Sequence, residues 1–235
     1  MASSITKHVQ HSLHDAIPSL EQGDRLNRGE FERRYGAMRG LKKAELVEGV
    51  VYMQSAVRFR SHGRPHHWLV TWIGVYESAT PGVCGTDNTS IRLDLDNMPQ
   101  PDTALFVAPE CGGQVTISED DYIEGAPEFV AEVTSSSVSY DLGDKLNAYR
   151  RNGVQEYLVW RVQERAFDWF VLREGNYQSI PPDEHGILKS ASFPGLWLDS
   201  EAMLAGRLAD ALSTLQSGLA GEEHASFVDR LRDET

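Results

Sequence analysis

Two acidic residues lie in apolar surroundings that predict buried strands. Asp102 follows Pro101 and leads into the apolar run 103–108, while Glu132 lies inside the apolar run 129–133. A carboxylate in a buried strand is costly to desolvate unless a cation or a hydrogen-bond donor pairs with it. Hard divalent cations such as Mg²⁺ prefer oxygen ligands, usually one or two carboxylates with water and a phosphate. The pair therefore predicts a metal site, provided that the two strands are neighbours.

Lys145 lies near the start of a predicted helix that follows the Glu132 strand. Cleavage of a phosphodiester by a metal needs carboxylates for the cation and a cationic or basic group that orients water and balances developing charge. Lys145 could be that group, with a pKa that burial would lower and nearby carboxylates would raise. Simpler explanations remain open: Asp102 caps a turn, and Glu132 forms a structural ion pair with Lys145.

Polar residues upstream could complete such a site. Glu48 precedes Gly49 in an apolar strand pair, so it could bind the same cation directly or through water, or be a turn carboxylate. His62 and His66 are four residues apart and could share a helix face, as zinc ligands sometimes do. We favour a substrate-facing or phosphate-facing role for one of them, His66, over a zinc site, and a structural role stays open.

The densest basic cluster of the chain is formed by Arg58, Arg60 and Arg64. It could bind phosphate, with Arg64 as a substrate-binding residue, or it could be a solvated loop. The 235-residue chain has a net charge of −13 and a pI near 5.0, which argues against a protein that coats nucleic acid through a basic face. A local basic groove beside a metal site stays compatible with that charge.

Composition also indicates the cellular compartment of the protein. No run approaches the roughly 18 apolar residues that span a bilayer, and the N-terminus lacks the apolar core of a signal peptide, so no membrane partner is expected. Cys84 and Cys111 are isolated thiols, which fit the reducing cytoplasm better than a disulfide framework and are too few for a cysteine zinc site.

Helix and strand signals surround these residues. Asn27 with Glu30 is a variant capping box, which predicts a short helix through Tyr35. The segment 44–53 reads as two strands or a tight hairpin around Gly49. We expect helices over 64–76, over 141–152 with an N-cap at 140–141 and a stop at Gly153, and from 200 onward; strands are expected over 90–96, 103–108, 129–133, 156–160 and 167–172, and residues 196–198 begin the closing segment.

The absence of internal repeats and long linkers predicts one domain with extensions. Residues 1–27 are polar, contain His8, His11 and His14, and are expected to form a flexible arm. A domain over 28–198 and a helical C-terminal extension over 199–235 complete the chain. Leucines 204, 208, 212 and 215 recur at helical spacing, which favours packing onto the domain over a dimer contact.

Several segments in order resemble the bacterial family called Putative restriction endonuclease domain, common in cyanobacteria and a branch of the PD-(D/E)XK nuclease superfamily. They cover roughly residues 28–175: ELVEGVV at 45–51, QPD at 100–102, EGAPEFVAEV at 124–133, YDLGDKLNAY at 140–149 and GVQEYLV at 153–159. The resemblance implies an α/β fold, restriction-endonuclease-like, with a mixed central β-sheet flanked by helices. It also implies a Mg²⁺ or Mn²⁺ site built from Asp102 and Glu132, with Glu48 in support.

The signature of the superfamily has a lysine two residues after the second acid, where this chain has Thr134. In this branch the lysine lies in the following helix, which corresponds to Lys145, so its chemistry depends on the geometry of that helix. The resemblance further implies DNA as substrate and a homodimer. Two other functions stay open: a non-catalytic binding or scaffold protein, and a hydrolase of another phosphate ester.

Overall fold

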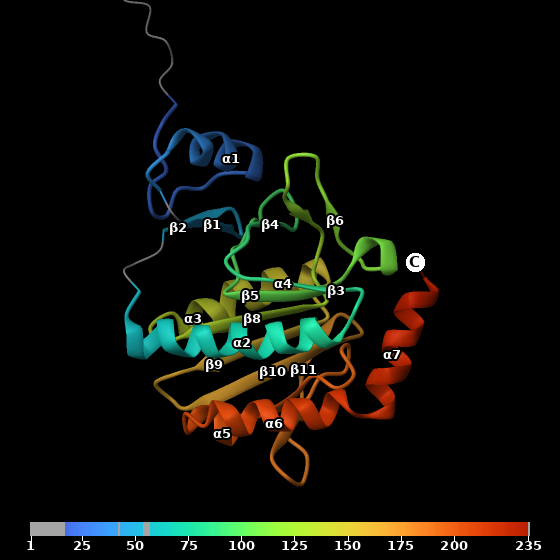
Figure 1. Cartoon of the computed structure of the whole chain (residues 1–235). Coiled ribbons are helices and arrows are strands. Elements are labelled where there is room, and N and C mark those ends of the chain that lie inside the picture. Colours follow the sequence, from blue (N-terminus) through green and yellow to red (C-terminus); the bar gives the residue numbers. More distant parts are fainter. Residues whose placement is uncertain (1–16, 42, 54–56, 235) are drawn as a thin grey trace, which may run out of the picture.

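A mixed six-stranded sheet forms the centre of the computed structural model, which describes residues 17–41, 43–53 and 57–234 (Figure 1). The strand order is β11-β10-β9-β8-β5-β3, and β8 and β9 are parallel while the other neighbours are antiparallel. The mixed central sheet expected from the resemblance is therefore present. The strands are β3 (Val83–Thr86), β5 (Thr103–Val107), β8 (Phe129–Thr134), β9 (Glu156–Arg161), β10 (Ala166–Arg173) and β11 (Asn176–Ser179).

Alternation along β5 and β8 divides their side chains between two cores. Leu105 and Phe129 point toward a core that contains α2 (Arg64–Ala79). Ala104 and Val130 point toward a second core with Tyr149 of α4 (Leu146–Asn152). Helices therefore flank both faces of the sheet, as Figure 1 shows for α2 and α4.

A hairpin and a helix form a separate layer above the sheet. Asn27 accepts a hydrogen bond from the Glu30 N–H at 3.0 Å and begins α1 (Arg28–Ala37), which confirms the expected capping. The expected hairpin is β1 (Ala44–Val47) and β2 (Val50–Met53). Leu20 is buried against this layer, so the end of the expected arm packs onto the folded domain. The three N-terminal histidines of the arm lie outside the described residues.

The helix expected over 141–152 differs in its start and its winding. It begins one turn earlier, as α3 (Val138–Tyr140), so the predicted cap at 140–141 is wrong. The turn η3 (Asp141–Lys145) is π-helical and α4 follows it without a break. Gly153, with φ of 89°, ends α4 as predicted.

The strand expected over 90–96 is also shorter than predicted, because β4 spans only Ile91–Arg92. After it the Asp94 carboxylate accepts hydrogen bonds from the Asn97 and Asn152 side chains, which fix a turn in place of a strand. The strand β4 pairs with β7 (Ile123–Glu124), which also pairs with β6 (Thr116–Ile117). A short 3₁₀ helix, η2 (Pro109–Cys111), lies between β5 and β6.

The C-terminal segment packs onto the α2 face of the sheet. A hairpin of β12 (Ile187–Lys189) and β13 (Trp197–Asp199) precedes α5 (Ser200–Leu204), α6 (Leu208–Leu219) and α7 (Glu222–Asp233). Leu215 and Phe227 belong to the same core as α2, which agrees with the intramolecular use expected from the leucine spacing. In the part of the chain that the structure describes, every helix is too short or too polar to cross a membrane.

Candidate active site

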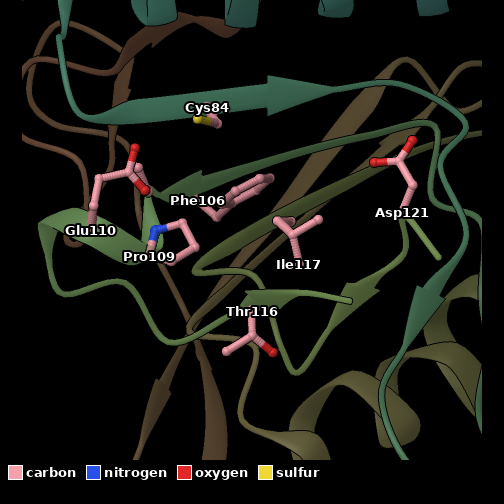
Figure 2. A pocket seen from close by; sticks show the side chains of 8 residues that line it. Cys84, Phe106, Pro109, Glu110, Thr116, Ile117 and Asp121 are labelled. Atoms are coloured by element: carbon pink, nitrogen blue, oxygen red, sulfur yellow. The ribbon is translucent and has the colours of Figure 1, made fainter. Parts of the chain in front are cut away.

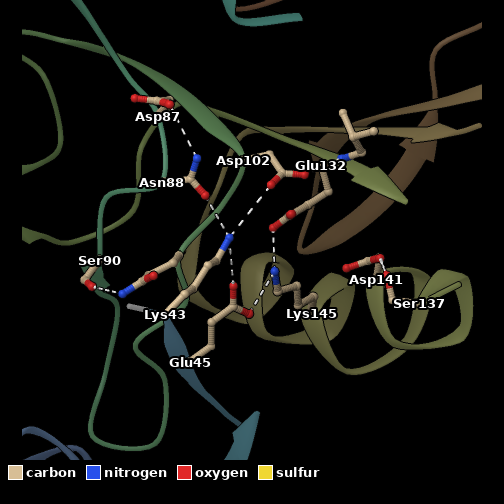
Figure 3. A network of polar contacts seen from close by, with 12 residues as sticks. Lys43, Glu45, Asp87, Asn88, Ser90, Asp102, Glu132, Ser137, Asp141 and Lys145 are labelled. Atoms are coloured by element: carbon tan, nitrogen blue, oxygen red, sulfur yellow. Dashed lines mark hydrogen bonds and ion pairs between the residues drawn. The ribbon is translucent and has the colours of Figure 1, made fainter. Parts of the chain in front are cut away.

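Asp102 and Glu132 lie on adjacent strands. Asp102 directly precedes β5, and β5 pairs with β8 so that Thr103 lies opposite Ala131. The N–H of Val133, the residue after Glu132, donates to Asp102 Oδ2 at 2.8 Å. Both side chains are almost fully buried. The condition set by the sequence, that the two strands be neighbours, is therefore met (Figure 3).

Lys145 extends from the end of η3 into the space between two carboxylates. Its Nζ lies 2.7 Å from Glu132 Oε1 and 2.9 Å from Glu45 Oε2. The hydroxyl of Tyr149, one turn further along α4, donates to the same Glu132 oxygen at 3.1 Å. The helix that follows the Glu132 strand thus delivers the lysine to the acids, which is the geometry that the sequence left open.

Glu45 is the acidic residue of this cluster that the sequence reasoning missed. It lies in the fully buried strand β1 and accepts a hydrogen bond from the Tyr140 hydroxyl at 3.2 Å. Glu48 was expected here instead, but it lies in the β1–β2 turn with φ of 53°, and its carboxylate pairs with Arg151 at 2.7 Å. Glu45 could have been found by the same signal as Glu132, a charged residue inside an apolar strand.

Cationic and imidazole groups face the other side of the acids. Lys43 Nζ lies 3.7 Å from Glu45 Oε1 and 3.8 Å from Asp102 Oδ1, and it donates to Asn88 Oδ1 at 2.9 Å (Figure 3). His62, in the π-helical turn η1 (Phe59–Gly63), places Nε2 3.2 Å from Asp102 Oδ2. Lys43 could not be predicted from the sequence, because it lies in a connection outside any periodic segment.

The two predicted metal ligands differ in the pKa of their carboxyl groups. Burial raises the pKa of Asp102, but the hydrogen bond and charge of His62 and the charge of Lys43 outweigh it and lower that pKa to about 2. Burial raises the pKa of Glu132 to about 8, opposed by Lys145. Nearby carboxylates, including those of Asp102 and Glu45, add to that rise.

Lys145 itself is a cation in this setting. Burial alone would lower its pKa, but the charges of Glu132 and Glu45 outweigh burial and raise the pKa well above its ordinary value. Of the two opposing effects that the sequence allowed, the carboxylates prevail. Lys145 is therefore suited to hold positive charge and donate hydrogen bonds, and not to accept a proton.

The donor set of the cluster fits a hard divalent cation. Asp102 and Glu132 offer carboxylate oxygens from adjacent strands, and the raised pKa of Glu132 reflects buried negative charge that its neighbours do not fully balance. Within the described ranges, no three His, Cys, Asp or Glu side chains are grouped as a complete metal cage. A cation held by Asp102 and Glu132 would thus take its other ligands from water and phosphate, as Mg²⁺ commonly does.

Of the two predicted substrate-binding residues, His66 contacts the backbone of Asp102 and Arg64 contacts Trp68. His66 Nε2 is 2.9 Å from the Asp102 backbone oxygen, and the Arg64 guanidinium stacks on Trp68 at 4.7 Å from the ring centre. A pocket of about 340 Å³ opens beside the acids and is lined by Lys43, Val57, His62, Gly63, His66, Asn88 and Gln100.

A larger pocket, of about 650 Å³, lies at the β3 edge of the sheet (Figure 2). It is lined by Cys84, Phe106, Ala108, Pro109, Glu110, Thr116, Ile117 and Asp121. None of the clustered acids lines it, so pocket size does not mark the chemistry in this molecule.

Comparison with known proteins shows the family and the fold of the chain. The chain belongs to the family described as Putative restriction endonuclease (Uma2), whose model matches residues 28–201 and so includes every residue of the cluster. A crystal structure from Anabaena variabilis ATCC 29413, described as a putative nuclease belonging to DUF820, is 14% identical. The alignment covers 73% of this chain and 90% of that chain, with a TM-score of 0.52, a likeness that shows the fold. No curated protein matches the sequence.

Proposed function

We propose that this protein is a metal-dependent endonuclease that hydrolyses phosphodiester bonds of DNA. The observation that carries the proposal is the meeting of three buried acids with two ammonium groups: Lys145 lies between Glu132 and Glu45, and Lys43 lies between Glu45 and Asp102. The chain belongs to the family described as Putative restriction endonuclease, which supports the same reaction class.

Each residue of the cluster has a role that follows from its contacts. Asp102, held ionised by His62 and Lys43, and Glu132 would hold Mg²⁺ or Mn²⁺. When bound, such a metal polarises a phosphate oxygen and lowers the pKa of coordinated water. Lys145, kept protonated by Glu132 and Glu45, would donate hydrogen bonds to water or phosphate and balance developing negative charge. Glu45 would position Lys145 and has no need to touch the substrate.

One observation favours a second candidate, a non-catalytic protein that retains the fold. The Lys145–Glu132 ion pair at 2.7 Å is the arrangement expected if the lysine only neutralises a buried acid. A binding protein of this kind would tolerate loss of the Asp102 carboxylate without change in its ligand affinity. The two candidates therefore differ in their response to metal and to Asp102.

Cleavage of supercoiled and single-stranded DNA in Mg²⁺, in Mn²⁺ and in EDTA tests the proposal. We expect wild type to cut only with metal, and Asp102→Asn and Lys145→Gln to lose at least about 100-fold in rate. Asp183→Asn is the matched control, because Asp183 pairs with Lys189 on the surface at 2.7 Å. Circular dichroism of each variant separates loss of activity from loss of fold. A wild type that is folded and inactive in both metals would favour the non-catalytic candidate.

Two further parts of the proposal concern the setting of the protein. Two isolated cysteines, Cys84 and Cys111, suit a reducing compartment better than a disulfide framework does, and we propose the cytoplasm. The resemblance to the nuclease family also suggests a homodimer, which light scattering at several concentrations would test. A mass that stays that of one 26.2 kDa chain would contradict the dimer.

A further inference from the structure

The segment leading into the candidate active site differs in charge from the rest of the protein. The chain has 35 acidic residues, yet neither Asp nor Glu occurs from Gly49 through Tyr76. That stretch carries Arg58, Arg60 and Arg64 together with three histidines. A local positive surface in a chain of net charge −13 indicates an anionic partner at this place.

The arginines of this segment are available to such a partner. Arg58 and Arg60 are exposed, and in the described part of the chain no carboxylate pairs with either guanidinium. The arginines paired with nearby acids elsewhere, such as Arg92 with Glu32 at 2.6 Å, are structural by comparison. Arg58 is the N-cap residue of the turn η1 and Arg60 lies within it, and the same turn carries His62, which contacts Asp102.

An aromatic ring lies between the two arginines. Phe59 is 68% exposed, and among the described residues no other Phe, Trp or Tyr is in the exposed class. The exposed phenyl ring leaves apolar area in water, and burying that area against a partner would be favourable. An aromatic side chain interleaved with arginines is the combination that stacks on an unpaired base while the cations bind the flanking phosphates.

The pocket beside the acids offers a place for the next nucleotide of the same strand. Its volume of about 340 Å³ is in the range of small-molecule sites, and its lining includes two amides, two imidazoles and an ammonium. These groups can donate to or accept from the edge of a base that is not paired in a duplex. The pocket adjoins the carboxylates through Lys43 and His62.

We propose that the segment Arg58–Arg60, together with this pocket, binds an unpaired nucleotide, so that the substrate is single-stranded DNA or a single-stranded region of a duplex. Phe59 stacks on a base, Arg58 and Arg60 bind the phosphates on either side, and the pocket receives the next base. This inference rests on the proposed function for its choice of DNA, and it goes beyond it in naming the strand form and the residues that recognise it.

Binding in EDTA, where metal-dependent cutting cannot occur, tests the inference apart from catalysis. Fluorescence anisotropy would compare a labelled single strand with the blunt duplex of the same sequence, using the full-length chain. We expect tighter binding of the single strand, and about tenfold weaker single-strand binding for Phe59→Leu, which keeps the apolar volume but loses the aromatic face. Phe59→Trp should retain binding. Leu95→Ala is the control, because Leu95 is a 70% exposed apolar residue outside the segment.

Salt dependence tests the two arginines. Replacing both Arg58 and Arg60 by Ala should reduce the slope of log affinity against log salt by about 1.4, because each single-strand phosphate contact contributes about 0.7. Arg173→Ala, an exposed arginine at the end of β10, should leave the slope unchanged. Circular dichroism of each variant confirms that it is folded.

The outcomes separate this inference from the proposed function. Tighter binding of the duplex, or equal affinities of wild type, Phe59→Leu and the double arginine variant, would overturn the inference even if the enzyme cuts DNA. Single-strand binding that depends on these residues, in a protein that cuts nothing in Mg²⁺ or Mn²⁺, would support the inference and overturn the proposed function.

Discussion

Lys145 is the residue on which the candidate site depends, because its ammonium contacts two of the buried acids. Glu132 and Glu45 would repel each other without it, and its charge opposes the rise that burial causes in the pKa of Glu132. Removing one partner of a buried ion pair leaves uncompensated charge, which costs more than the pair itself contributes. The lysine therefore has a structural role whether or not it acts in catalysis.

We expect Lys145→Met to lower the free energy of unfolding by about 3–5 kcal/mol, since two buried carboxylates lose their cation. Adding Glu132→Leu should recover part of that loss, because it removes one of the uncompensated charges. Urea unfolding of wild type, single and double variants at one pH measures both effects. A double variant less stable than Lys145→Met would show that Glu132 is stabilised by groups other than Lys145.

Glu45 and Glu48 lie three residues apart on one hairpin, so the cleavage rates of their Gln variants can be compared directly. Glu45→Gln should reduce the rate of metal-dependent cleavage by about 10–100-fold, because it removes a group that positions Lys145. Glu48→Gln should leave the rate unchanged, because Glu48 pairs with Arg151 outside the cluster. Single-turnover cleavage under identical conditions measures both variants. Equal losses of cleavage rate in the two variants would show that Glu48 also acts in the site.

At the scale of elements, two π-helical turns position the site. The turn η1 carries His62 and the turn η3 ends at Lys145, so both turns bring a nitrogen group to the acids. A π turn contains an extra residue relative to an α-helix and often occurs at functional sites. Here each turn continues directly into a regular helix, α2 or α4, which lies on the sheet and fixes the direction of the turn.

The helix α7 is attached to α2 through a buried histidine. His224 Nε2 lies 3.0 Å from Thr80 Oγ1, and its ring packs edge-on against Tyr76 with 5.8 Å between ring centres. Burial lowers the pKa of His224 below 6.5. The unfolded chain therefore binds a proton at this residue more readily than the folded protein does.

Stability should consequently fall as the pH drops below about 6.5, because protons then favour the unfolded state. We expect His224→Gln, which can keep a hydrogen bond to Thr80, to lose less stability than wild type between about pH 7 and about pH 5. Urea unfolding at both pH values measures the difference. Parallel losses in the two proteins would place the acid sensitivity elsewhere.

At the scale of the whole molecule, the fold joins three cores around the sheet. The C-terminal helices α6 and α7 contribute Ala211, Leu215, Phe227 and Leu231 to the core of the α2 face. These residues lie beyond the span matched by the family model, which ends at 201. The last helices thus complete a shared core in this chain.

Metal should stabilise the whole molecule if the acids bind it. A cation that binds only the folded protein raises the unfolding free energy by about 2.7 kcal/mol at 100 times its dissociation constant. We expect Mg²⁺ or Mn²⁺ to raise the melting temperature of wild type and to have no effect on an Asp102→Asn/Glu132→Gln variant. Differential scanning calorimetry with and without EDTA measures this. An equal rise in both proteins would mean that the metal binds elsewhere.

Much of the architecture was accessible from local patterns. The cap at Asn27, the hairpin at Gly49 and the stop at Gly153 follow from backbone preferences that act over a few residues. Asp102 and Glu132 could be singled out from the sequence because a charged residue next to or within an apolar strand is unusual. Periodicity likewise indicated α2 and the central strands.

Other features were decided by tertiary contacts. Neither the π winding of η3 nor the early end of β4 has a local signal, because packing and side-chain hydrogen bonds set them. The meeting of Lys43, Glu45 and His62 at the acids depends on how the hairpin and η1 lie against the sheet. The sequence by itself determined which charged residues lie in segments that favour burial. Only the tertiary structure decided which partners neutralise them, because pairing energy depends on distance and surroundings and not on position along the chain.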